Sequence, residues 1–179
     1  PGISSAASDV YKRQANPLVE AGWRKAVVEL TSEVLFDFSV DVDGQPQRPG
    51  EGPLGKRQIF AITGGRFEGP KLRGVVLPGG GDWLMIRPDG VGELDVRITL
   101  VTDDEATIYM HDPGLLHCPD ATRAKMRQGE TVTGDDYYMR CTPRFETGDA
   151  RYDWLNRLIA VGVGERLENG VGYRVFAIT

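Results

Sequence analysis

Hydrophobic and polar residues alternate along much of this chain. In Glu33–Val42 every second side chain from Val34 onwards is apolar, and Asp37, Ser39 and Asp41 face the other way. Because successive side chains of a strand point to opposite faces, this spacing predicts a strand with one buried face. The stretch Ile62–Leu100 contains short runs of the same kind, separated by breakers such as Pro78–Gly81 and Pro88–Gly90. It therefore predicts antiparallel sheet that folds back on itself.

The same rules predict the remaining elements. Strands are expected at Arg57–Thr63, Lys71–Leu77, Asp82–Arg87, Val91–Thr102, Glu105–His111, Tyr137–Phe145, Trp154–Val163 and Val171–Ile178. Pro119–Gln128 is typical of one short helix closed by Gly129, and Asn169-Gly170 predicts a hairpin. Asp43–Gly55 has no periodicity, so we expect a loop there, either a lid over a barrel mouth or a disordered segment. Asn16–Leu30 fits a short helix, and the alternative is that Lys25–Leu30 is already a strand.

Consecutive antiparallel strands with little helix limit the possible architectures. They must stack as two sheets or close into a barrel, and only closure removes the exposed strand edges. No internal repeat and no regular alternation of strands with helices is present. A barrel of about eight strands leaves room for one small ligand.

Composition narrows the class of partner. The net charge is −5 and no basic stripe occurs, which argues against nucleic acid and anionic membranes as partners. No apolar run of about 18 residues predicts a membrane span, and no signal-peptide pattern is found, so a cytoplasmic protein is expected. Cys118 and Cys141 make no disulfide framework and are interpreted as thiols.

The first residues form a separate case. Residues 4–14, SSAASDVYKRQ, resemble the translation of a sequencing-library adapter joined in frame to a gene, as in a metagenomic assembly. We therefore interpret residues 1–14 as an artefact without functional meaning and expect the native N-terminus to be missing. Residues 15–179 are expected to form a single domain.

Three segments together resemble a known family: ITGGRFEGPKLRGVVLPGGGDW from Ile62, RPDGVGELDVRITLVTDD from Arg87 and YYMRCTPRFETGDARYDWLN from Tyr137. They are similar to domain-of-unknown-function family 3237 of bacteria and fungi, small proteins thought to form lipocalin-like barrels. The likeness runs in order from Leu35 to Ile178. It implies an all-β, antiparallel, lipocalin- or calycin-like closed barrel of about eight to nine strands with one or two short helices. It implies no reaction and no catalytic residues.

The strand expected at Val91–Thr102 has one ionisable face. Glu93, Asp95 and Arg97 point to one side, opposite an apolar side. If the ionisable face looks into a barrel, it buries charges that persist only when they are paired or used. In that case Asp95 is a candidate general acid or base, and Arg97 would hold developing negative charge. If the face looks outward, the charges form an ordinary solvated ladder.

Two other places carry candidate catalytic groups. Tyr138 and Arg140 share one side of their strand, where a hydroxyl beside a guanidinium could polarise a carbonyl group. Alternatively, Arg140 pairs with a carboxylate on a neighbouring strand. Asp82 lies between a triple glycine and Trp83, where apolar neighbours would raise its pKa towards that of a general base or acid. Alternatively, Asp82 caps the glycine turn.

A further set of residues is predicted to line and orient a ligand. Its members are Trp83, Glu93, Tyr109, Trp154 and Asn156. Trp154 and Asn156 share a face and could offer a stacking surface and an amide, although core packing with a satisfied amide fits equally.

Metal and cofactor chemistry is only weakly indicated. His111 and His117, with Asp112 and Cys118 nearby, lack the spacing of a known metal motif. The glycine-rich residues 79–81 and 162–164 lack the context of phosphate or dinucleotide binding. We therefore expect neither a metal nor a cofactor.

These residues predict a small-molecule-binding barrel that is a cofactor-independent enzyme. It would carry out acid-base chemistry on an apolar or aromatic carbonyl compound, as an isomerase, lyase, hydratase or cyclase. The predicted catalytic residues are Asp82, Asp95, Arg97, Tyr138 and Arg140. The alternative is a non-catalytic carrier of a small apolar ligand. A third hypothesis is a homo-oligomer-forming structural barrel, in which the charges are strand ladders and subunit contacts.

Overall fold

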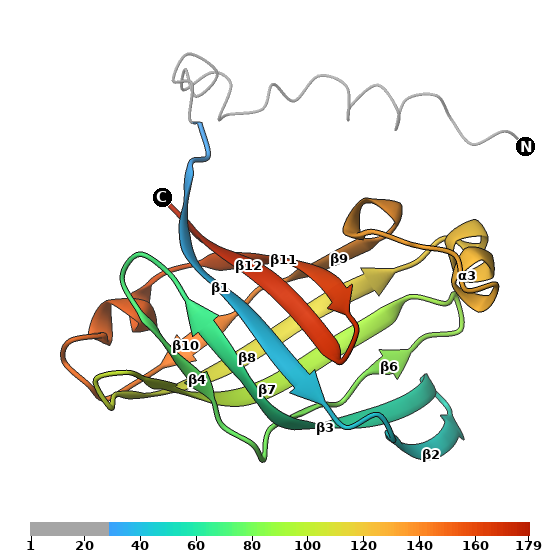
Figure 1. The fold of residues 1–179 in the computed structure, drawn as a ribbon, viewed down its shortest axis with the longest axis horizontal. Helices are drawn as coiled ribbons and strands as arrows, with labels where there is room; N and C mark the ends of the chain where they lie inside the picture. The colour runs from blue at the N-terminus through green and yellow to red at the C-terminus, as the bar shows by residue number, and fades with distance from the viewer. Residues whose placement is uncertain (1–28) are drawn as a thin grey trace, which may run out of the picture. The chain divides into compact units, whose positions relative to one another are not determined.

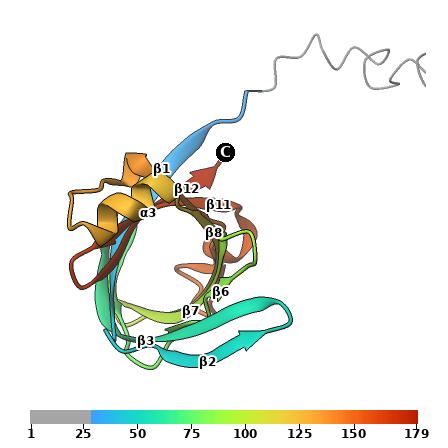
Figure 2. The same cartoon turned by 90° about the vertical axis from the view of Figure 1, so that its right-hand side faces the viewer.

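The alternating segments form antiparallel strands that wrap around a common axis (Figures 1 and 2). The structure, a computed structural model, describes residues 29–179. The strands are β1 (Ser32–Val42), β2 (Gln47–Gly52), β3 (Gly55–Glu68), β4 (Arg73–Val76), β5 (Gly81–Asp82), β6 (Met85–Ile86), β7 (Gly92–Thr102), β8 (Thr107–His117), β9 (Tyr138–Cys141), β10 (Arg144–Glu146), β11 (Ala160–Leu167) and β12 (Gly170–Ile178). One α-helix, α3 (Asp120–Arg127), and two 3-10 turns, η2 (Gly134–Asp136) and η3 (Asp153–Arg157), complete the described elements.

Strand pairing closes the sheet into a barrel. From β7 the pairing runs through β8, β9, β11, β12, β1 and β3, and it returns to β7 through the short strands β4, β5 and β6. These three segments pair with β3 on one side and β7 on the other, so they act as one interrupted strand. The result is a closed antiparallel barrel of eight strands, seen along its axis in Figure 2. The predicted fold class is confirmed.

The barrel interior follows the alternation in the sequence. On β7 the side chains of Leu94, Val96, Ile98 and Leu100 are buried, and those between them face the outer surface. The end of the barrel away from α3 is filled by aromatic rings. Phe36 lies edge-on to Phe38, Phe67 and Phe145, with ring centroids 5.7–5.9 Å apart. Such edge-to-face pairs stabilise a core beyond their buried area, so this end is closed.

Strand β1 departs from the predicted alternation at one point. Its pairing with β12 shifts between Val34 and Phe36, which marks a β-bulge. The bulge turns Leu35 into the core, where it is 1% exposed, and leaves Val34 40% exposed. The prediction that Val34 shares the buried face is therefore wrong.

Two other predicted elements are corrected. The expected loop Asp43–Gly55 contains β2, which pairs with β3 and is exposed along its whole length. The expected strand Trp154–Val163 begins as η3 and becomes a strand only at Ala160. The helix predicted at Pro119–Gln128 is confirmed as α3.

The predictions for the N-terminal residues lie outside the described part. They concern the artefact at residues 1–14 and the helix or strand at Asn16–Leu30. Within residues 29–179, no helix is long and apolar enough to cross a membrane.

Candidate functional site

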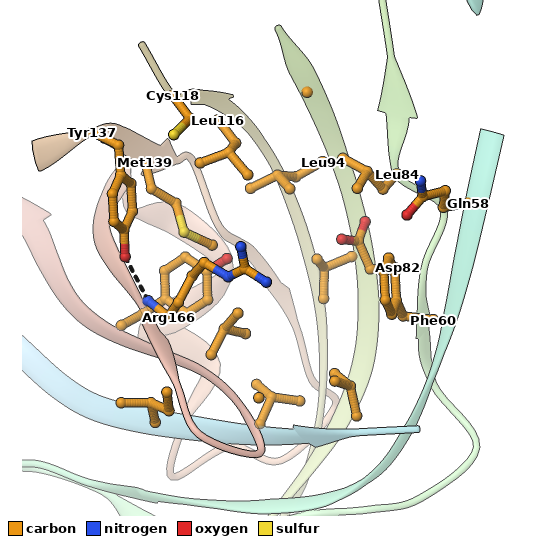
Figure 3. A pocket seen from close by; sticks show the side chains of 18 of the residues that line it. Gln58, Phe60, Asp82, Leu84, Leu94, Leu116, Cys118, Tyr137, Met139 and Arg166 are labelled. Carbon is orange, nitrogen blue, oxygen red and sulfur yellow. Dashed lines mark hydrogen bonds between the residues drawn. The ribbon is translucent and has the colours of Figure 1, made fainter. Parts of the chain in front are cut away.

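A cavity of about 720 Å³ occupies the end of the barrel next to α3 (Figure 3). This volume lies within the range of small-molecule sites. Its walls are mostly apolar and come from both sides of the barrel. They include Val40, Phe60, Ile62, Leu84, Leu94, Val96, Leu116, Met139 and Val171. The cavity reaches solvent at a mouth formed by α3, the β1–β2 connection and the β11–β12 hairpin.

Asp82 is the carboxyl group on the inner wall of this cavity. Strand β5 holds it opposite Val96 on β7 and Phe60 on β3. The glycines before it allow this close pairing, because a Cβ on Gly80 would lie 2.4 Å from the Arg97 carbonyl oxygen. The Asp82 carboxylate accepts a hydrogen bond of 3.1 Å from the backbone N–H of Asp95.

Burial raises the pKa of Asp82 to about 6. The Asp95 N–H lowers this pKa, the Asp95 charge raises it, and the Arg57 guanidinium lowers it, but removal from water is the largest effect. A carboxyl group with this pKa is ionised at neutral pH and still binds a proton readily. These are the properties of a general base.

Tyr137 lies on the wall opposite Asp82 (Figure 3). Its hydroxyl oxygen accepts a hydrogen bond of 2.7 Å from the backbone N–H of Arg166 on β11. The hydroxyl proton has no acceptor among the described residues. Because the oxygen already accepts the Arg166 N–H, the proton points elsewhere and can be donated to a ligand.

A second phenol, Tyr173 on β12, also lines the cavity. Its ring stacks on Phe38 with centroids 5.0 Å apart. It lies flat against β11 at Gly164, where a Cβ would be 2.5 Å from the ring. Burial raises the pKa of Tyr173 well above its usual range, so its hydroxyl group stays protonated and is available as a donor.

Asp112 is buried in the barrel wall beside the cavity. It follows Asp82 and Val96 in one cross-strand row from β5 through β7 to β8. Its side chain is 1% exposed, and neither carboxylate oxygen has a hydrogen-bond partner among the described residues. The pKa of Asp112 is raised to about 7, mainly by burial; the Cys141 thiol lowers this pKa and the Asp82 charge raises it.

Polar groups also gather at the mouth of the cavity. Gln58, Arg123 and Arg166 contribute side chains there. Arg123 is held by Asp120 at 2.6 Å and by the Gly90 carbonyl oxygen at 3.2 Å. Within residues 29–179, no three His, Cys, Asp or Glu side chains gather as a metal site would require.

The ionisable face of β7 looks outward. Asp95 binds Arg97 at 3.1 Å and His111 at 3.0 Å on the outer surface. Leu94 and Val96 occupy the inner surface. Of the two orientations allowed by the sequence, the structure has the solvated ladder, and it does not bring Asp95 or Arg97 into the cavity.

Tyr138 and Arg140 also lie outside the cavity. The Arg140 guanidinium lies 5.1 Å from the centre of the Tyr138 ring and donates to the Met139 carbonyl oxygen at 2.8 Å. Tyr138 is 51% exposed. The inner side of this strand carries Tyr137 and Met139 instead.

The five predicted ligand-binding residues do not line the cavity. Trp83, Glu93 and Tyr109 have exposed side chains on the outer surface. The Lys71 ammonium lies 5.5 Å from the centre of the Trp154 ring. Asn156 is used to hold a loop, because its amide accepts from and donates to the Thr147 backbone at 2.9 Å. Thus Asp82 is the predicted site residue that the structure places in the cavity.

Sequence reasoning missed several groups of this site. Asp112 occupies an inward position between Met110 and Gly114. A single carboxylate on the apolar side of a strand is unusual, and this is the sequence signal that could have identified it. Tyr137 and Tyr173 could not be identified from the sequence, because a tyrosine on the apolar face of a strand usually packs in the core. Arg166 shows no pattern of its own, since its place at the mouth depends on how the barrel closes.

The fold and the cavity together define a class: a small antiparallel β-barrel with a carboxyl group of raised pKa on the inner wall of an internal cavity. More particularly, the chain belongs to the family described as protein of unknown function (DUF3237), whose model matches residues 30–178. The resemblance inferred from the sequence is thereby confirmed.

Relatives of this family have been found in several bacteria. A UPF0311 protein of Clostridium acetobutylicum is 34% identical over 154 residues, which cover 86% of this chain and 97% of the relative. A beta-barrel like protein from Acinetobacter baumannii has a solved structure with 38% identity and a TM-score of 0.74, covering 84% of this chain and 97% of that one. A protein of unknown function from Rhodopseudomonas palustris matches with 33% identity and a TM-score of 0.77, covering 84% and 99%.

A more distant match is a structure described as an enzyme from Penicillium herquei. It is 21% identical with a TM-score of 0.63, and the match covers 84% of this chain and 95% of that chain. At this identity the likeness shows a shared fold.

Proposed function

We propose that this protein is a cofactor-independent enzyme that transfers a proton within a small apolar or aromatic carbonyl compound, as an isomerase, lyase, hydratase or cyclase does. Asp82 is the general base. The observation that carries the proposal is a carboxyl group with a pKa of about 6 on the inner, mostly apolar wall of a cavity of about 720 Å³. Burying such a group lowers stability, and carboxyl groups with pKa values shifted in this way are typical of active sites.

The proposed step is removal of a proton from the carbon next to a carbonyl group. The Asp82 carboxylate takes the proton, the C–H electron pair forms the carbon–carbon double bond of an enolate, and the carbonyl π electrons move to oxygen. The hydroxyl protons of Tyr137 and Tyr173 are available to donate hydrogen bonds to that oxygen. Where a carbon–carbon double bond of the substrate is conjugated with this enolate, return of the proton from Asp82 to the γ-carbon, with the double bond shifting to the α,β-position and the carbonyl group re-forming, completes an isomerisation. Acid-base assistance of this kind is typically worth about 10² to 10⁴ in rate.

Solvent exchange tests this chemistry without knowledge of the natural substrate. A panel of aromatic ketones and 1,3-dicarbonyl compounds is incubated with the protein in D₂O, and deuterium uptake at the α-carbon is followed by proton NMR. We expect catalysed exchange of at least one compound. Its rate should rise with pH through about 6 and then level off, because the ionised carboxylate is the base.

Two variants separate the cavity carboxyl group from a surface one. Asp82→Asn should abolish the catalysed exchange while thermal stability is kept. Glu93→Gln is the control, since Glu93 also lies on β7 but is exposed on the outer surface, and it should exchange at the wild-type rate. Equal exchange by Asp82→Asn and wild type would refute the assignment. Compounds that bind the wild type without any exchange would point to the carrier instead.

A further inference from the structure

The mouth of the cavity holds a guanidinium group without a carboxylate partner. Arg166 is anchored through its backbone, whose N–H donates to the Tyr137 hydroxyl oxygen at 2.7 Å. Its side chain extends into the space between Tyr137 and Asp82 (Figure 3). There the Arg166 Nη1 contacts the Met126 Sδ at 3.8 Å, and a thioether is a weak acceptor. No carboxylate among the described residues lies within ion-pairing distance of this guanidinium.

The other arginine of the cavity is already occupied. Arg123 forms an ion pair of 2.6 Å with Asp120 and donates to the Gly90 carbonyl oxygen. Its donors are therefore partly used by the protein. Arg166 is left as the cation with unused hydrogen-bond donors on the cavity wall, and a guanidinium offers five donors in a planar fork that matches a carboxylate or sulfonate.

The inner end of the cavity is unsuited to a negative charge. Asp82 lies on its wall, and Asp112 is buried behind that wall in the same cross-strand row. Both carboxyl groups are in an apolar environment, where repulsion between like charges is weakly screened. The walls between these groups and the mouth are apolar. An anionic ligand would therefore place its charge at the mouth and its apolar part towards Asp82.

We infer that the ligand of this cavity is an amphipathic anion, an apolar or aromatic carbonyl compound whose carboxylate, sulfonate or phenolate oxygen is bound by Arg166 at the mouth. The inference rests on the proposed function for the identity of the cavity, and it adds the class of substrate and its orientation. Asp43 and Glu168 also lie at the mouth. The Asp43 carboxylate accepts the Gln45 backbone N–H at 2.9 Å, so it is bound to its own turn, and Glu168 belongs to the exposed β11–β12 turn.

A matched pair of fluorescent probes tests the inference. The anion 8-anilino-1-naphthalenesulfonate and the neutral N-phenyl-1-naphthylamine share one aromatic body and differ in the sulfonate group. Both are titrated into the full chain, and their dissociation constants are compared for wild type, Arg166→Gln and Arg140→Gln. Arg140 is the control, because its guanidinium lies on the outer surface beside Tyr138. Leu94→Trp, which narrows the cavity, shows whether the probes bind inside.

The expected result is that Arg166→Gln selectively weakens the anionic probe. Arg166→Gln should weaken the sulfonate about tenfold and the neutral amine less than about twofold, as expected for a charge-assisted hydrogen bond. Arg140→Gln should change neither constant, and Leu94→Trp should weaken both probes.

Two outcomes would overturn the inference, and they are distinguishable. If both probes bind in the cavity but Arg166→Gln weakens them equally or not at all, the anion site is refuted and the chemistry proposed for Asp82 stands. If neither probe binds, or Leu94→Trp leaves both constants unchanged, the cavity does not accept such ligands. The inference then fails, whereas the proposed function is decided separately by the deuterium exchange of wild type and Asp82→Asn.

Discussion

Replacing Asp112 by Asn removes a charge from the barrel interior with almost no change in volume. The side chain is 1% exposed and its carboxylate has no hydrogen-bond partner among the described residues. Asparagine has nearly the shape and polarity of the protonated acid. The substitution therefore isolates the free energy of ionising this group in the folded protein.

The size of the effect follows from the pKa of Asp112. Burial raises it from 3.8 to about 7, so the folded state holds the proton more tightly than the unfolded chain. Below pH 4 the group is protonated in both states and has no effect on stability. Above this pH its contribution becomes unfavourable and reaches its full size near pH 7. Each pH unit is worth about 1.4 kcal/mol, so the full contribution is at most about 4 kcal/mol.

Urea unfolding followed by tryptophan fluorescence measures this difference. We expect Asp112→Asn to match the wild type at pH 4 and to be more stable at pH 8, with an unchanged m-value. Asp37→Asn is the control of opposite sign, because the Arg174 guanidinium lowers the pKa of Asp37, and it should slightly reduce stability at pH 8. The quantity to compare is the free energy of unfolding of Asp112→Asn minus that of wild type. If this difference is no larger at pH 8 than at pH 4, the reasoning is refuted.

Two further predictions concern Gly164 and Cys141, which lie near the Tyr173 ring. Gly164→Ala should lower the free energy of unfolding by about 1 to 3 kcal/mol, because its Cβ would lie 2.5 Å from the Tyr173 ring. The control Gly148→Ala, with nothing within 4 Å of its Cβ, should be neutral in the same urea titration, and equal losses would contradict the packing argument. Cys141 should resist a disulfide reagent at pH 8 until the protein unfolds, since burial raises the pKa of its thiol. Cys118, which is half-buried, should react first, and simultaneous reaction of both thiols would count against this placement.

Much of the fold could be predicted because alternation records which face of a strand is buried. On β7 the buried residues Leu94, Val96, Ile98 and Leu100 alternate with more exposed ones, and most of β8 and β12 shows the same alternation. The strand β2 could not be predicted, since its residues Gln47–Gly52 are all exposed and their backbone pairing with β3 leaves no apolar pattern. Trp154 and Leu155 favour a strand by propensity, but the Asn156 amide bonds to Thr147 and holds this segment in a 3-10 turn.

The candidate site was less predictable because it depends on which face of each strand looks inward. Asp82 could be proposed from its apolar neighbours. Asp95 and Arg97 attracted attention as a cluster of charges, yet a cluster of opposite charges is also what a solvated surface ladder contains. Tyr137 and Arg166 come together only because β9 pairs with β11, a pairing that the sequence pattern does not reveal.

The phenylalanine cluster at the far end has a consequence for the proposed function. Phe36 and its ring neighbours pack that end, and the cavity lies at the other end, beside α3. Under the function proposed above, product would leave by the route through which substrate entered. Accumulated product would therefore inhibit competitively, and a long polymer could present only its tip to Asp82.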